Sequence, residues 1–285
     1  MISRVMLVVF SLLLLIKPVQ AAQSMITEAE GNACMGDDRS RKQTEQAALT
    51  DAKKNAVEFT STYIKSETEV KNSILEKDVL AAYTHAEVKI IQELSKEWYK
   101  DSNSGDCLKM KIKAEVIPDT AAMEKLAKLS PTSAEDPAAP LTVKTWTDKK
   151  NYKLGEKVKI YIKGNKPFFA RVLYRDVSGA TIQLLPNPYQ SDNYYNGGTI
   201  YELPSGKDKF ELEVSPPFGE ENIIVYGSTS PLGDIAVQTR GSVYQVTSTA
   251  KDAAIRTRGI KLVEAGGKQM PSEFSEASTS LNTAK

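Results

Sequence analysis

The chain has 285 residues and carries 37 Lys and Arg against 36 Asp and Glu, with one His and two Cys. This length suggests one or two domains, and a hydrophobic content of 41% suffices for a buried core. The balanced charge removes the electrostatic argument for nucleic-acid binding. One His and two Cys supply at most three His or Cys ligands for zinc, fewer than the four of a structural zinc site. We therefore expect no nucleic-acid partner, no metal and no cofactor.

Residues 1–21 have the pattern of a bacterial secretory signal peptide. Arg4 supplies the positive start, Val5 to Ile16 is almost wholly apolar, and small residues precede a cleavage point after Ala21. The alternative is a membrane anchor, but a helix of this apolar run rises roughly 18 Å against a hydrocarbon core of about 30 Å. We expect export to the periplasm or beyond, with no transmembrane segment in the mature chain.

Export changes the interpretation of the two cysteines. In an oxidising compartment, Cys34 and Cys107 most simply form a disulfide with each other. The alternative is a pair of buried free thiols. The loop between them is long, so in the chain-entropy description the bond would stabilise the fold by roughly 4 kcal/mol.

The mature chain is expected to open with a small α+β domain, residues 22–118. Ser40 and Gln43 have the form of a capping box, and a helix follows over 41–63, whose apolar stripe is mostly Ala. Residues 108–116 alternate between apolar and charged side chains, which predicts a strand with one buried and one solvated face. Between these two segments, 63–70 favours a strand and 74–83 is ambiguous. Residues 85–99 begin as a predicted strand, and 94–98 either continue that strand or turn helical.

This first domain resembles the amino-terminal domain of flagellar assembly protein T and of LPP20-type envelope lipoproteins. The matching segments are 28–31, 47–52 with 55–57, and 111–116. The cysteines are not part of that pattern. The residue patterns of this domain predict one helix packed on a small antiparallel sheet. The resemblance implies a module for assembly and interaction, with no catalytic residues.

Residues 119–140 are expected to form a short helix and then an exposed linker with three prolines. From 141 to 264 the chain changes to short strands separated by turns, which predicts an all-β sandwich that folds independently and ends in a strand over 255–263. The tail, residues 265–285, is rich in Ser, Thr and Glu, and we expect it to be disordered.

The β domain resembles the bacterial domain-of-unknown-function family 4384. Five segments carry the resemblance in the expected order: 151–158, 184–189, Pro204, 216–219 and 257–260. The family's usual acidic, glycine-rich hairpin is reduced here to 176–179. The family occurs as a module of exported proteins, and the resemblance implies no activity.

One segment of the β domain, 186–198, has the composition of a binding loop. Tyr rings beside amide and carboxylate side chains suit contacts with sugars or peptides, because each ring offers an apolar face with hydrogen-bonding groups at its edge. The alternative is an ordered loop whose tyrosines cap the sandwich core. The candidate ligand-binding residues are Asn187, Tyr189, Asp192, Tyr194 and Tyr195.

The other candidate residues are more consistent with structural roles than with catalysis or metal binding. His85 has no nucleophile near it in sequence, Asp37 and Asp38 belong to a turn without the ligand spacing of a cation site, and Glu28 with Glu30 would lie on one strand rather than across a cleft. The sequence therefore predicts a non-catalytic, exported cell-envelope protein that binds other envelope proteins. A carbohydrate- or peptidoglycan-binding protein that uses the loop 186–198 is the alternative.

Overall fold

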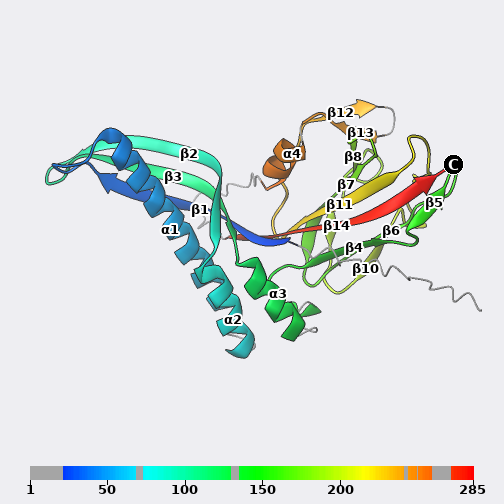
Figure 1. Ribbon diagram of the computed structural model, residues 1–285, viewed down its shortest axis with the longest axis horizontal. Helices are drawn as coiled ribbons and strands as arrows, with labels where there is room; N and C mark the ends of the chain where they lie inside the picture. Colours follow the sequence, from blue (N-terminus) through cyan, green and yellow to red (C-terminus); the bar gives the residue numbers. More distant parts are fainter. Residues whose placement is uncertain (1–21, 69–72, 130–134, 241–242, 249, 259–270) are drawn as a thin grey trace, which may run out of the picture.

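The computed structural model describes residues 22–68, 73–129, 135–240, 243–248, 250–258 and 271–285 (Figure 1). The predicted signal peptide, residues 1–21, lies outside the described residues. In chain order the elements are β1 (Ala22–Cys34), α1 (Arg41–Thr68), α2 (Ser73–Thr84), β2 (Glu87–Asp101), β3 (Gly105–Ile117), α3 (Thr120–Leu129), β4 (Val143–Thr147), β5 (Asn151–Lys153), β6 (Ile160–Gly164), β7 (Phe168–Arg175), β8 (Thr181–Leu185), β9 (Tyr194–Tyr195), β10 (Ile200–Leu203), β11 (Glu220–Ser228), β12 (Val237–Arg240), β13 (Val243–Val246), α4 (Ala250–Thr257) and β14 (Ser272–Ala284).

Within the described residues the strands form one sheet of eleven and one sheet of three. The order of the large sheet is β12-β13-β8-β7-β11-β14-β1-β3-β2, with β5 beside β14 and β9 beside β7, and the small sheet is β10-β6-β4. We call β1–β3 with α1 and α2 the amino-terminal lobe, and β4–β13 the β lobe. Figure 1 shows the two lobes along the long axis, with β14 entering both. The predicted α+β class is confirmed.

Helix α1 packs closely on the sheet of the amino-terminal lobe. The capping box is present, because the Ser40 backbone N–H donates to the Gln43 side chain and the Gln43 N–H donates to Ser40 Oγ. Ala48, Ala52 and Ala56 are fully buried against Leu108, Met110 and Ile112 of β3. Gly31 of β1 lies beneath α1, where an added Cβ would approach the Ala48 carbonyl oxygen and the Ala52 nitrogen. The small side chains therefore set the close approach of helix and strand.

The strand predicted over 63–70 is wrong for 63–68, because α1 continues to Thr68; residues 69–70 lie outside the described residues. Thr60 and Ile64 are buried and continue the four-residue spacing of the alanine stripe, so tertiary packing outweighs the low helix propensity of the threonines. The ambiguous segment 74–83 is helical and belongs to α2. Residues 87–101 remain strand throughout, with register shifts near Ile90 and Glu93.

The alternating strand predicted over 108–116 is confirmed, but its second face is not wholly solvated. Lys109 and Lys111 pair with Glu30 and Glu28 of β1 at 2.8 Å each and remain partly exposed. Lys113 and Glu115, nearer the β lobe, are buried. The charged face of β3 is therefore open at one end and enclosed at the end that meets the other lobe.

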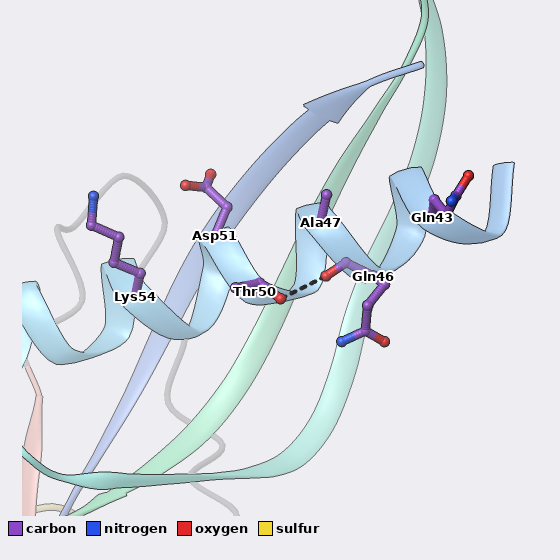
Figure 2. A pocket seen from close by; sticks show the side chains of 6 residues that line it. All are labelled: Gln43, Gln46, Ala47, Thr50, Asp51 and Lys54. Atoms are coloured by element: carbon purple, nitrogen blue, oxygen red, sulfur yellow. Dashed lines mark hydrogen bonds between the residues drawn. The ribbon is translucent and has the colours of Figure 1, made fainter. Parts of the chain in front are cut away.

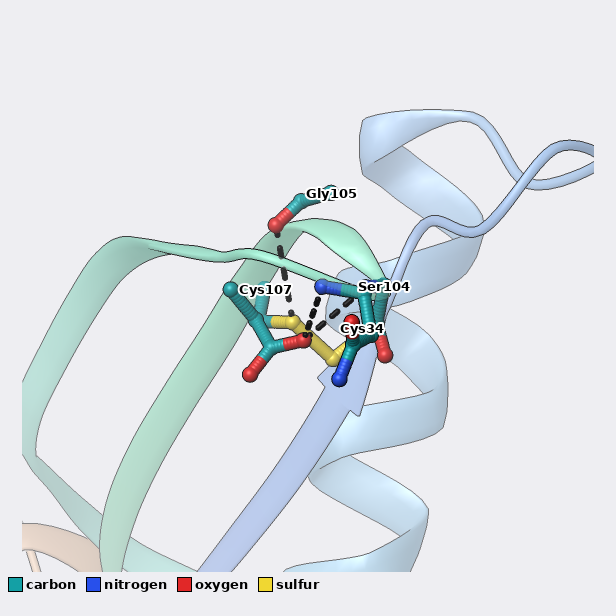
Figure 3. The surroundings of a disulfide bond; sticks show 6 residues. Cys34, Ser104, Gly105 and Cys107 are labelled. Carbon is teal, nitrogen blue, oxygen red and sulfur yellow. Dashed lines mark hydrogen bonds between the residues drawn. A yellow bond between two sulfur atoms is a disulfide. The ribbon is translucent and has the colours of Figure 1, made fainter.

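Cys34 and Cys107 form a disulfide, as predicted. The two residues lie directly opposite each other on β1 and β3, so the bond joins neighbouring strands at the outer end of the lobe (Figure 3). Beside it, the Asp101 carboxylate accepts hydrogen bonds from the backbone N–H groups of Asn103 and Ser104, and these bonds lower the pKa of Asp101. Gly105 closes this turn with φ 73°, a conformation that favours glycine.

The prediction of a disordered tail over 265–285 is wrong for 272–284, which form β14. This strand lies between β1 and β11 and is antiparallel to both, with pairs such as Met25 with Glu273 and Val225 with Ala277. Its composition is polar, yet Ser275 and Thr283 are buried and hydrogen-bonded. Hydroxyl groups that bond to neighbouring backbone or carboxylate groups make such a strand compatible with a sheet interior.

Side chains from both lobes meet around β14. Arg258 pairs with Glu115 of β3 at 2.8 Å and with Glu276 of β14 at 3.0 Å. Ile26 of β1 belongs to an apolar cluster with Leu173, Tyr226 and Phe274. The prediction of a final strand over 255–263 is wrong at its start, because α4 extends to Thr257; residues 259–263 lie outside the described residues.

The β lobe is built from the small sheet packed across the curled end of the large one. Its core contains Val143, Ile160 and Ile162 from the small sheet and Phe168 and Val225 from the large sheet. The predicted short helix before it is α3. The predicted exposed linker is buried at its end, at Ala139 and Pro140. There the Asn165 side-chain amide donates to the carbonyls of Asp136, Ala139 and Pro140.

Candidate functional site

The loop 186–198 connects β8 to β10, and its first half is fixed by one buried side chain. Asn187 donates its amide to the Leu184 carbonyl at 2.7 Å, and its side-chain oxygen accepts the backbone N–H groups of Tyr189 and Gln190 at 2.8 Å each. Further along, the Asp192 carboxylate accepts the N–H of Tyr194 at 3.1 Å. The loop is therefore held by its own polar side chains.

Strand pairing gives the two adjacent tyrosines opposite roles. β9 pairs with the start of β7, with Tyr195 opposite Phe168 and Tyr194 opposite Phe169. Neighbouring side chains on a strand point to opposite faces, so Tyr195 enters the core and is 4% exposed, whereas Tyr194 is 48% exposed. The Tyr195 ring lies 4.8 Å from the Tyr201 ring, and burial raises the pKa of its hydroxyl.

Two tyrosines of the loop present rings at the surface. Tyr194 rests on Phe169, with ring centres 5.0 Å apart. Tyr189 is 49% exposed and its ring is nearly parallel to that of Phe210, with centres 6.3 Å apart. Of the five predicted site residues, Tyr189, Asp192 and Tyr194 thus lie at the surface, while Asn187 and Tyr195 are buried and serve the loop and the core.

The remaining sequence candidates lie apart from this loop. His85 is exposed just after α2, and Asp37 and Asp38 are exposed between β1 and α1. Glu28 and Glu30 pair with lysines of β3. Among the residues described, no group of three or more His, Cys, Asp or Glu side chains is placed to hold a metal ion. In the same part of the chain, no helix combines the length and the apolar character that a membrane span needs.

A shallow pocket lies on α1, but its polar groups are already engaged or widely exposed. It is lined by Gln43, Gln46, Ala47, Thr50, Asp51 and Lys54 (Figure 2). The Thr50 hydroxyl donates to the Gln46 carbonyl at 2.8 Å, and the Asp51 carboxylate accepts the Asn32 N–H of β1 at 2.9 Å. These bonds stabilise the helix and its contact with β1.

A second aromatic surface, which the sequence analysis did not single out, lies on the outer side of the small sheet. Trp146 of β4 and Tyr161 of β6 are directly opposite each other, with stacked rings 5.6 Å apart. The next row of the same face holds Lys144, Lys163 and Ile200, of which Ile200 is 56% exposed. We call these five residues the outer sheet face. The sequence signal for this face was the alternation of apolar and polar residues in 141–146 and 157–163. That alternation places Trp146 and Tyr161 on the side of the sheet away from the core.

Comparison with known proteins identifies part of the β lobe. Residues 151–231 match the family described as "Domain of unknown function (DUF4384)". The match covers the segment from β5 to just beyond β11 and includes the loop 186–198. The resemblance predicted over 141–264 is thus confirmed for 151–231. No curated protein and no solved structure was found to match the chain.

Proposed function

Because residues 151–231 carry a DUF4384 module, and a disulfide joins β1 to β3, we propose that this chain is a non-catalytic, exported protein of the bacterial cell envelope that binds other envelope proteins. A disulfide supports an oxidising compartment, since such bonds are rare in reducing cytosol. The signal-peptide pattern of residues 1–21 supports export independently.

The observation that carries the binding role is the pair of half-exposed tyrosines on a braced loop. Tyr189 and Tyr194 each rest on a phenylalanine, and the side chains of Asn187 and Asp192 hold the loop backbone. A surface that is ordered before binding loses less conformational entropy on binding, and tyrosine is among the residues that contribute most at interfaces.

The test compares one double variant and one single control variant with the wild-type protein, in a pull-down from native envelope extract. Tyr189→Ala with Tyr194→Ala should remove partners that the wild-type protein retains, with truncation of each anchor costing about 1–3 kcal/mol of binding free energy. Tyr99→Ala is the matched control, because Tyr99 of β2 is 45% exposed but lies in the other lobe. Unchanged recovery of the same partners by the double variant would exclude this loop.

Export is tested separately, by fractionating cells that express the full chain. Amino-terminal sequencing of the periplasmic or secreted protein should find a new start after Ala21. Retention of the full chain in the cytoplasm would contradict the proposed location.

The glycan alternative draws on the same two tyrosine rings, whose exposed faces suit the apolar face of a sugar as well as a peptide. Cosedimentation with purified peptidoglycan separates the two functions. Binding to protein-free peptidoglycan that is lost in the double tyrosine variant would favour the glycan function over protein binding.

A further inference from the structure

On the outer sheet face, two positive charges lie directly opposite each other. Lys144 of β4 pairs in register with Lys163 of β6. Like charges at directly opposed positions destabilise an antiparallel pair unless an anion lies between them. Here that anion is the carboxylate of Glu135, with Oε2 2.8 Å from Lys163 Nζ and Oε1 3.4 Å from Lys144 Nζ.

Glu135 belongs to the segment between the lobes, not to the sheet itself. Asp136, Ala139 and Pro140, which follow it, are held through their carbonyls by the buried Asn165 amide. The Glu135 side chain is instead 54% exposed, and its carboxylate bonds to the ammonium groups of Lys144 and Lys163. Its hydrogen bond with Lys163 lowers the pKa of this carboxyl group. The glutamate is thus a partly exposed occupant of a two-lysine site.

Apolar and aromatic groups adjoin the two lysines on the same face. Ile200 of β10 lies opposite Lys163, and the stacked pair of Trp146 and Tyr161 forms the next row. Residues two apart on a strand are separated by roughly 7 Å, so the rings and the two ammonium groups lie within reach of one short peptide. Trp and Tyr with a charged rim are typical of protein interfaces.

We propose that the outer sheet face binds an acidic peptide segment of a partner protein, whose carboxylate replaces that of Glu135 between Lys144 and Lys163. The proposal rests on the proposed role in binding envelope proteins and specifies the chemistry of one partner. A peptide is favoured as the occupant because the present occupant is itself an acidic peptide segment, with Asp136 next to Glu135. Glu135 then acts as an internal competitor that lowers the apparent affinity for the partner.

The test is an NMR titration of the isotopically labelled mature protein with a synthetic peptide that has the sequence of residues 133–139. Glu135→Gln should bind this peptide roughly two- to tenfold more tightly than wild type, since the two partly exposed ion pairs of Glu135 no longer compete. In the Glu135→Gln background, Lys144→Met with Lys163→Met should abolish binding, and Lys209→Met, an exposed lysine elsewhere, should not. A peptide with Gln in place of its Glu should bind more weakly than the original peptide to the wild-type protein and to Glu135→Gln.

Two results would overturn the proposal: equal peptide affinity in Glu135→Gln and wild type, or binding that survives the double Met substitution. Saturable binding of peptidoglycan fragments or anionic lipid vesicles at these lysines, without peptide binding, would also overturn it. Melting temperatures of all variants check that they remain folded. Tyr189→Ala with Tyr194→Ala should leave peptide binding intact, so failure of the envelope pull-down and failure of this inference are separate outcomes.

Discussion

The guanidinium carbon of Arg258 lies 4.3 Å from the centre of the Phe274 ring, while the same group pairs with Glu115 and Glu276. This side chain, which directly follows α4, thus contacts β14 and reaches β3 of the amino-terminal lobe. Glu115 is buried, so it depends on this cation for compensation of its charge.

Arg258→Met should strongly destabilise the protein, because it leaves the Glu115 carboxylate buried beside Ser24 without its cation. Breaking a buried pair from one side typically costs about 3–5 kcal/mol. Urea unfolding at neutral pH measures this loss. Arg39→Met, at an exposed position between β1 and α1, is the control and should change the free energy of unfolding little.

β14 should be essential to the β lobe. Leu281→Ala removes a buried side chain from its core and is expected to cost about 2–5 kcal/mol, whereas Ser280→Ala at the neighbouring exposed position should be nearly neutral. A fragment of residues 141–264 lacks this strand, so we expect it not to fold alone, contrary to the independent folding that the sequence suggested. A cooperative thermal transition of that fragment would contradict this expectation.

Gly31→Ala should disrupt the contact between β1 and α1. The added Cβ would meet backbone atoms of Ala48 and Ala52 at 2.2 Å, and backbone cannot rotate away as a side chain can. Overpacking of this kind costs about 1–3 kcal/mol or more. Gly206→Ala is the matched control, because nothing lies within 4 Å of the Cβ position there. Equal melting temperatures of the two variants would refute the close approach.

The disulfide should stabilise the whole molecule rather than one lobe. Cys34→Ser with Cys107→Ser should lower the free energy of unfolding by up to about 4 kcal/mol, because the unfolded chain regains the entropy of a long loop. Since β1 pairs with both β3 and β14, calorimetry should show one transition that moves to lower temperature. A shift confined to the first of two separate transitions would indicate that the lobes unfold independently.

Alkaline unfolding should depend on Tyr152. Its ring is buried and its hydroxyl donates to Asp148 at 2.7 Å, and these two effects raise the pKa of Tyr152 to about 12. The unfolded chain ionises near pH 10, so stability is intact below that value and falls as pH rises towards 12. Tyr152→Phe should lose about 2–3 kcal/mol less of its free energy of unfolding than the wild-type protein between about pH 10 and pH 12. Urea unfolding at several alkaline pH values measures both slopes; identical slopes would contradict the assignment.

The spacing of apolar residues along the sequence correctly predicted those elements in which buried side chains recur at one regular interval. The alternation of 108–116 and the four-residue spacing of Ala48, Ala52 and Ala56 correctly identified β3 and α1. Composition failed for 272–284, because serines and threonines that bond within a sheet have the same polarity as those in a disordered tail. Their partners, such as Val143 and Glu221, are distant in sequence.

The candidate loop was only partly predictable for a related reason. Composition singled out Tyr189, Tyr194 and Tyr195 together, but only the register of β9 against β7 separates the buried Tyr195 from the exposed Tyr194. The outer sheet face was visible as alternation around Trp146 and Tyr161. The contact of Glu135 with Lys144 and Lys163 was not, because it requires the fold of the segment between the lobes.

The position of β14 also has a consequence for the order of folding. Ala22 pairs with Glu276, so the seam between the lobes joins residues at opposite ends of the described chain, and contacts of such high contact order form slowly. Before β14 pairs with them, β1 and β11 each have an unpaired edge beside apolar residues such as Met25 and Val225. Newly synthesised chains would therefore expose two strand edges that can pair with other chains, and we expect them to need a holding chaperone during that interval.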